Sequence, residues 1–135
     1  VVVEAPVVEN ATPDVSEANY QIVRDALRGV ATENRDVSND FSRYDFTFAA
    51  KTGTAEVAGK QDFAWFACYA PYEDPRFALA LCIEEGGSGG AVASPVAARV
   101  MKAAIDYSNG ATIDYEKISV GTPGKPQQAG GESNE

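Results

Sequence analysis

The sequence predicts an α+β domain in which helices cover a three-stranded antiparallel sheet. Three apolar runs, 44–56, 63–70 and 77–84, are separated by segments short enough to be hairpin loops, so consecutive strands should pair as a meander. The second and third runs are apolar almost throughout, which indicates a sheet covered on both faces. Helices on both faces are therefore expected, in an α/β/α sandwich, and this chain supplies two long ones.

The composition narrows the possible functions. The 135 residues carry a formal net charge of −9 and include no histidine. No basic stripe exists to neutralise phosphates, so we do not expect nucleic acid as a partner. Without histidine, Ser-His-Asp triads and most zinc sites are excluded, and no metal or cofactor is expected.

The first helix is expected to begin near Ser16 and to run for about four turns. Residues 1–12 are rich in valine and are expected to extend into the domain, and either Asp14 or Ser16 can cap the helix after them. Apolar residues at helical spacing then form one face: Val23, Ala26, Leu27 and Val30. The next segment, 32–43, is polar and is expected to be a loop.

The second hairpin is expected to be closed by a loop at 71–75, with Ala70 opposite Arg76. In that register Cys68 and Cys82 lie about four residues apart along the strands, which is too far for a disulfide. We therefore predict that both cysteines are unpaired.

A glycine-rich segment, Gly86–Gly90, follows the third strand. It lacks the Gly-Lys-[Ser/Thr] ending of a phosphate loop and is expected to be a flexible connection. Ser94-Pro95 predicts the start of a second helix and Asn109-Gly110 its end. We expect a folded portion at 1–120, a disordered tail at 121–135, and a chain that is part of a longer protein.

The stretch Lys51-Thr52-Gly53-Thr54 in the first strand combines a cation, two hydroxyls and a glycine. Alternate side chains of a strand share a face, so Thr52 and Thr54 project together and suit one carboxylate. Gly53 lets a substrate backbone approach the strand edge closely. A lysine inside an apolar run indicates a site that needs a positive charge; the alternative interpretation is an ordinary surface hairpin.

This stretch resembles the Lys-Thr-Gly motif of penicillin-binding proteins and serine β-lactamases. The longer match is to class B penicillin-binding proteins, the β-lactam-sensitive transpeptidases of cell-wall synthesis in cell elongation or division. It comprises Lys-Thr-Gly-Thr-Ala-Glu at 51–56, Ala-Trp-Phe at 64–66, Tyr-Ala-Pro at 69–71 and the glycines at 86–90. Two residues depart from the family pattern, Leu27 in place of methionine and Cys68 in place of glycine.

The resemblance implies roles for five residues of the strand. Lys51 and Thr54 would be catalytic, with the Thr54 N–H as an oxyanion donor. The substrate-binding residues would be Thr52, Gly53, Thr54 and Glu56. The implied substrates are D-Ala-D-Ala stem peptides of peptidoglycan, and β-lactams that acylate the same site.

The nucleophile is not in this chain, because the sequence contains neither Ser-x-x-Lys nor Ser-x-Asn. The resemblance therefore covers about the last third of a transpeptidase domain, and this portion alone would be inactive. It implies an upstream fragment of the same domain that carries both motifs, at the extracytoplasmic face of a bacterial membrane. Alternatives on the same fold are a D,D-carboxypeptidase, a class D β-lactamase and a non-enzymatic β-lactam sensor or interaction module.

Overall fold

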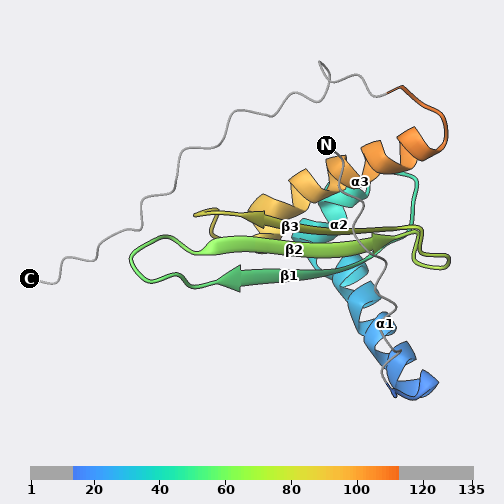
Figure 1. The fold of residues 1–135 in the computed structure, drawn as a ribbon, viewed down its shortest axis with the longest axis horizontal. Coiled ribbons are helices and arrows are strands. Elements are labelled where there is room, and N and C mark those ends of the chain that lie inside the picture. Colours follow the sequence, from blue (N-terminus) through green and yellow to red (C-terminus); the bar gives the residue numbers. More distant parts are fainter. Residues whose placement is uncertain (1–13, 113–135) are drawn as a thin grey trace, which may run out of the picture.

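The computed structural model describes residues 14–112 (Figure 1). Within these residues, seven elements follow one another: α1 (Glu17–Glu33), α2 (Arg35–Phe41), β1 (Ala49–Ala55), β2 (Phe63–Ala70), β3 (Phe77–Ile83), the π-helical segment η1 (Gly89–Ala93) and α3 (Ser94–Ser108). The α+β class is confirmed. The expectations for residues 1–12 and for the tail from 121 lie outside the described residues.

The sheet is an antiparallel meander in the order β1-β2-β3, as predicted. The expected register of the second hairpin is wrong by one residue, because Ala70 pairs with Phe77 and Cys68 with Leu79. The Arg76 N–H donates to the Ala70 carbonyl at 3.0 Å, but the first residue of β3 that pairs with Ala70 is Phe77. Both cysteines are nevertheless free, as predicted.

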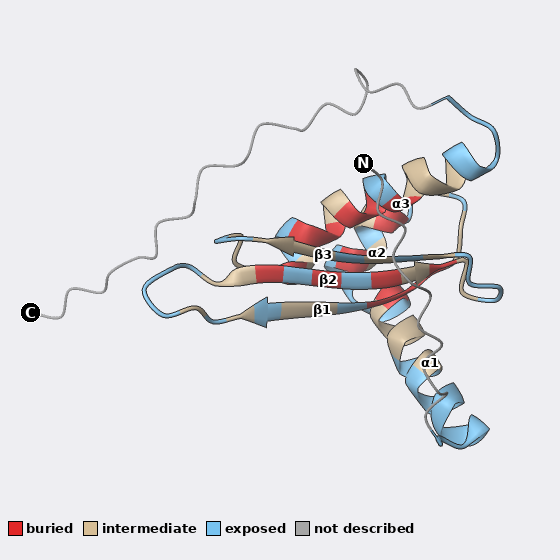
Figure 2. Cartoon of the chain, viewed as in Figure 1, coloured by how far each residue is buried: buried red, intermediate tan, exposed pale blue. Residues whose placement is uncertain are grey.

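One face of the sheet, here called the covered face, packs against the helices (Figure 2). Alternate residues of β2 point into this core and are buried: Ala64, Phe66, Cys68 and Ala70. Val37 and Phe41 of α2 and Met101 of α3 belong to the same cluster. Phe66 is 1% exposed, and burial of such a side chain contributes about 1.5–3 kcal/mol.

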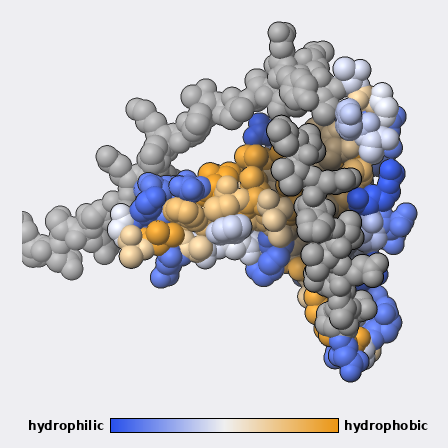
Figure 3. Space-filling model, in the orientation of Figure 1, coloured by the Kyte–Doolittle hydropathy of each residue, from blue (hydrophilic) through white to orange (hydrophobic). Residues whose placement is uncertain are grey.

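The opposite face, here called the open face, carries apolar side chains that the described helices leave accessible. Trp65 is 44% exposed, and the small residues Ala67, Ala78 and Ala80 are exposed around it. Figure 3 shows hydrophobic side chains gathered over the strands. The continuous apolar character of β2 and β3 therefore has a different basis on each face: packing against α2 and α3 on one, and an apolar surface on the other.

Helix α1 contacts β1, runs at a steep angle to the strands and extends away from the sheet toward its N-terminal end (Figure 1). Of the two capping candidates, Ser16 is the cap, and its Oγ accepts from the Asn19 N–H at 3.4 Å. Ala31 is the only buried residue of α1, and Val23 is 57% exposed. No helix within residues 14–112 is both long and apolar enough to cross a membrane.

The prediction of a loop at 32–43 is wrong, because this segment contains α2. Asn34 caps the helix and accepts a hydrogen bond from the Val37 N–H at 3.3 Å. Val37 and Phe41 lie four residues apart on one side, so both are buried while polar residues occupy the rest of the helix surface. The polar residues that indicated a loop are a cap and a solvated helix face.

The glycine-rich connection is also more ordered than predicted, because it leads into η1 at Gly89. Ser88 caps this turn and its Oγ accepts from the Ala91 N–H at 3.3 Å. The helical segment thus begins five residues before Ser94, which is buried within it. Its end at Asn109-Gly110 agrees with the prediction, and Gly110 has a φ of 89°.

Candidate functional site

Four of the five predicted site residues, 51–54, lie on β1, which is an edge strand of the sheet within residues 14–112. Thr52 is half-buried and Thr54 exposed, and both share the side of β1 that faces η1 and the covered face. Lys51 is exposed on the other side of the strand, opposite Ala67. The structure therefore places the two hydroxyls together, with the ammonium group on the opposite side of the same edge.

The backbone of β1 offers hydrogen-bonding groups along its free edge. The Lys51 Nζ donates to the Thr52 carbonyl at 2.6 Å, so this carbonyl has a partner outside the β1–β2 ladder. In an antiparallel pair, the N–H and C=O groups of one residue point toward the partner strand, and those of the next residue point away from it. The N–H and C=O groups of Thr54 accordingly face the free edge together with those of Thr52.

Gly53 has a packing reason as well as the predicted functional one. It pairs with Trp65 of β2, and a Cβ on Gly53 would lie 3.1 Å from the Trp65 Cβ. The absence of a side chain at Gly53 therefore avoids crowding against the Cβ of the paired tryptophan. Trp65 lies directly opposite Gly53, and its side chain is exposed on the open face.

Gly89 meets the same pair of residues from the covered face. A Cβ there would lie 2.3 Å from the Trp65 carbonyl oxygen and 2.4 Å from the Gly53 carbonyl oxygen, which real structures do not tolerate. A Cβ on the next residue, Gly90, would lie 3.8 Å from Thr52 Cγ2. The glycine-rich segment thus supports the Lys-Thr-Gly stretch directly. Sequence analysis missed this contact, and its one signal was the position of the glycines just before the helix.

Glu56 follows the last residue of β1 and is exposed. One interpretation of the sequence has its charge neutralised by Lys60 across the turn. That interpretation is wrong, because the Lys60 Nζ lies 3.9 Å from the Glu85 Oε1 and forms its ion pair there. Glu56 thus places a negative charge beyond the end of the site strand.

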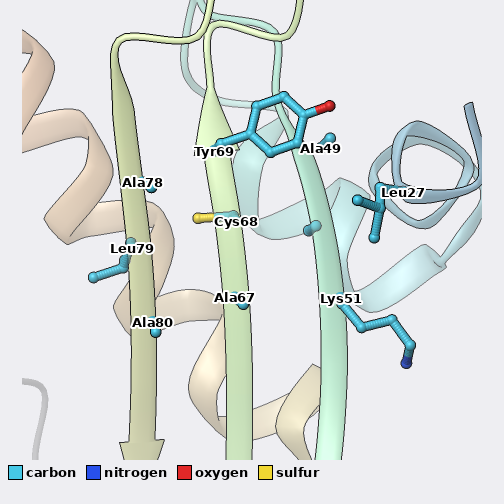
Figure 4. A pocket seen from close by; sticks show the side chains of 10 residues that line it. Leu27, Ala49, Lys51, Ala67, Cys68, Tyr69, Ala78, Leu79 and Ala80 are labelled. Carbon is cyan, nitrogen blue, oxygen red and sulfur yellow. The ribbon is translucent and has the colours of Figure 1, made fainter. Parts of the chain in front are cut away.

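A concavity of about 480 Å³ lies on the open face beside Lys51 (Figure 4). Its lining is apolar except for Lys51 and Tyr69, and it includes Leu27 of α1 and Ala80 of β3. In Figure 4 the Lys51 side chain extends away from the strands, and the Tyr69 ring lies beside Ala49. A cation at the rim of an apolar hollow, next to a free strand edge with two hydroxyls, is suited to bind an anionic peptide-like ligand.

Comparison with known proteins assigns this arrangement to a family. Residues 4–102 match the model of the penicillin binding protein transpeptidase domain. Among curated proteins, the peptidoglycan D,D-transpeptidase MrdA of Haemophilus influenzae is 31% identical over 127 residues, covering 80% of this chain and 19% of that protein. The peptidoglycan D,D-transpeptidase PbpA of Mycolicibacterium smegmatis is 38% identical over 66 residues, covering 42% of this chain and 13% of that protein.

Solved structures agree. Pseudomonas aeruginosa PBP2, in complex with WCK 5153, superposes with a TM-score of 0.64 at 29% identity, over 85% of this chain and 26% of that one. Penicillin-binding protein A of M. tuberculosis, an imipenem acyl-enzyme complex, gives a TM-score of 0.58 at 27% identity, over 67% and 20%. The chain thus spans 13% to 19% of these curated relatives and 20% to 26% of these solved chains.

Proposed function

The chain belongs to the penicillin-binding protein transpeptidase domain family, and on this premise we propose that it supplies the Lys-Thr-Gly strand of a peptidoglycan D,D-transpeptidase. The observation that carries the proposal is the edge strand β1, with Thr52 and Thr54 on one side and Lys51 on the other. Its relatives from Haemophilus influenzae and Mycolicibacterium smegmatis carry the name peptidoglycan D,D-transpeptidase, which supports this function over a hydrolase or a sensor.

In the proposed mechanism the substrate lies along the free edge of β1. Thr52 and Thr54 donate hydrogen bonds to its terminal carboxylate, and the Thr54 N–H stabilises the oxyanion that forms at the scissile carbonyl. A serine from the upstream segment attacks this carbonyl, the C–N bond breaks, and D-alanine leaves with a proton. An amine of a second stem peptide then displaces the serine. Lys51 contributes positive charge beside the nucleophile.

The nucleophile and its base belong to the upstream fragment of the same domain, which carries Ser-x-x-Lys and Ser-x-Asn. Two features support such a companion: the apolar open face around Trp65, and the outer edge of β3, which is unpaired within residues 14–112. Natural proteins cover apolar faces and blunt open strand edges. We further propose that the complete protein acts at the extracytoplasmic face of a bacterial membrane, anchored by a segment outside this chain.

The test uses the full-length protein and a fluorescent penicillin. Lys51→Ala is expected to slow covalent labelling by about 100-fold, which is typical for loss of one electrostatic contact in a transition state. Lys60→Ala is the matched control, because Lys60 is also an exposed lysine near the strand but pairs with Glu85. It should label at the wild-type rate. Equal labelling of wild type and Lys51→Ala, with equal thermal midpoints, contradicts the proposal.

A further inference from the structure

Two arginines of α1, one turn apart, contact the same tyrosine in the β2–β3 loop. The Cζ atoms of Arg24 and Arg28 each lie 5.3 Å from the centroid of the Tyr72 ring. The Tyr72 hydroxyl donates to the Asp25 Oδ1 at 3.0 Å, so the ring is held between α1 side chains. Each cation–π contact of this kind contributes about 0.5–1 kcal/mol at an exposed site.

The two arginines differ in the second group that they bind. The Arg24 Nη2 donates to the Tyr72 carbonyl at 3.0 Å and thus stays within the contact between α1 and the loop. The Arg28 Nη1 donates to the Phe48 carbonyl at 2.7 Å. Phe48 is the residue immediately before β1, so Arg28 alone of this pair holds the start of the site strand.

The residues just before β1 are fixed from several directions. The Phe48 ring stacks on Phe41 of α2 with centroids 3.9 Å apart and planes 16° apart. The Thr47 hydroxyl accepts from the Tyr72 N–H at 3.1 Å and donates to Glu73. These contacts hold the Phe48 side chain and the loop, whereas the bond from Arg28 fixes the peptide group that leads into β1.

We infer that Arg28 is a positioning residue for Lys51, an inference that rests on the proposed function. Among the described residues, β1 has a neighbouring strand on one side only, so its first residues depend on contacts from outside the sheet. Lys51 follows Phe48 by three residues. Leu27, which precedes Arg28 on α1, lines the concavity beside Lys51 (Figure 4). Loss of the bond from Arg28 lets this end of β1 shift, and a misplacement of about 1 Å can slow a reaction by about 100-fold.

The experiment compares Arg28→Ala with Arg24→Ala in the full-length protein. Both remove a cation–π contact with Tyr72, but only the first removes a hydrogen bond to the start of β1. Acylation by benzylpenicillin is followed by stopped flow, and the rate constant is expressed per active site titrated at completion. We expect a loss of at least about tenfold for Arg28→Ala, less than about twofold for Arg24→Ala, and partial recovery in Arg28→Lys.

If Arg28 and Arg24 only stabilise the fold, both alanine variants have a lower titrated fraction or a lower thermal midpoint. The acylation rate constant per titrated site then stays at the wild-type value. Equal rate constants for Arg28→Ala and Arg24→Ala therefore overturn the inference. Hydrogen exchange of the peptide covering 49–52 provides a readout that does not need acylation, and it should be faster in Arg28→Ala alone. If the wild type is not acylated, the proposed function fails, but hydrogen exchange still tests the role of Arg28. Equal exchange in both variants overturns the inference that Arg28 positions the start of β1.

Discussion

At the scale of single residues, Glu56 carries a charge that the site does not require. The carboxylate of a substrate bound along β1 would lie near it, and Lys60, which one interpretation of the sequence gives it as a partner, pairs with Glu85. A separation of ~7 Å and an effective dielectric of about 40 give a repulsion of roughly 1 kcal/mol, or about fivefold in acylation rate.

Glu56→Gln keeps the shape of the side chain and removes its charge. We expect it to speed acylation by anionic β-lactams several-fold at low salt, and we expect the gain to shrink as salt screens the repulsion. The measurement is the acylation rate across a series of ionic strengths. A rate that equals the wild-type rate at every ionic strength would show that Glu56 does not act on the site.

Cys68 predicts a pH dependence of stability. Burial on the covered face raises the pKa of its thiol to about 12, against 9.0 for an ordinary cysteine. The folded state therefore keeps the proton between these values while the unfolded state loses it. This contribution to stability is complete below pH 9 and falls by about 1.4 kcal/mol per pH unit from there toward pH 12.

Urea unfolding of the full-length protein at pH 8, 9 and 10 tests this expectation. Cys68→Ala should weaken the decline in unfolding free energy above pH 9, and the control Cys82→Ala should decline like the wild type, because Cys82 is only half-buried. An identical decline in wild type and Cys68→Ala would mean that the thiol ionises as readily in the folded protein as in the unfolded chain.

The residue scale also shows what the sequence could and could not reveal. Thr52 and Thr54 share one side of β1 because alternation along a strand is a local property. The true partners of Cys68 and Glu56 depend on loop closure and on ion-pair geometry, which involve residues distant in the chain. The predicted register and the suggested Glu56–Lys60 pair therefore failed, although the unpaired state of the cysteines was predicted correctly.

At the scale of elements, the contact between η1 and the site strand explains the glycine at position 89. Gly89→Ala would place a methyl group 2.3 Å from the Trp65 carbonyl oxygen, so η1 or β1 must shift. We expect a destabilisation of about 1–3 kcal/mol, as for other overpacked sites, and slower β-lactam acylation.

Gly29→Ala is the matched control, because the same change meets no crowding on α1. The nearest atom to an added Cβ is the Glu33 Oε1 at 3.7 Å. Alanine inside a helix should stabilise the protein by about 0.5–1 kcal/mol relative to glycine. Thermal denaturation should thus move the two midpoints in opposite directions, and a Gly89→Ala midpoint at or above that of the wild type would contradict the packing argument.

Elements with strong apolar periodicity were predicted well, and the two short elements α2 and η1 were not. Helices α1 and α3 and the three strands carry long apolar patterns, and all five were found in the expected order. Helix α2 has seven residues, and its polar positions outnumber Val37 and Phe41, so tertiary packing of these two decides its conformation. Segment η1 was missed for a similar reason, because close contact with Gly53 and Trp65 orders its glycines.

At the scale of the whole molecule, the chain is one part of a layered fold. The continuous apolar runs predicted a sheet covered on both faces, and within residues 14–112 α2 and α3 pack on one of them. The open face around Trp65 and Ala67 retains the apolar character that such a sheet needs. Sequence patterns can thus indicate that a covering layer is required, but they do not identify the residues that form it.

The central claim is that β1 binds the carboxylate of the substrate through its threonine hydroxyls. It is tested most directly by acylation of the full-length protein with benzylpenicillin and with its methyl ester, which lacks the negative charge. Thr54 is exposed, so Thr54→Val keeps the branched shape and should fold normally. Thr32→Val is the control, because its hydroxyl donates to carbonyls of α1 itself, at 3.2 and 3.4 Å.

We predict that Thr54→Val lowers the acylation rate for the free acid by about tenfold or more and leaves the rate for the ester nearly unchanged. A hydrogen bond to a charged group is worth about 1.5–3 kcal/mol, which sets this scale. Thr32→Val should leave both rates at the wild-type values. An equal change for acid and ester in Thr54→Val, or no change in either, would contradict a carboxylate-binding role for β1.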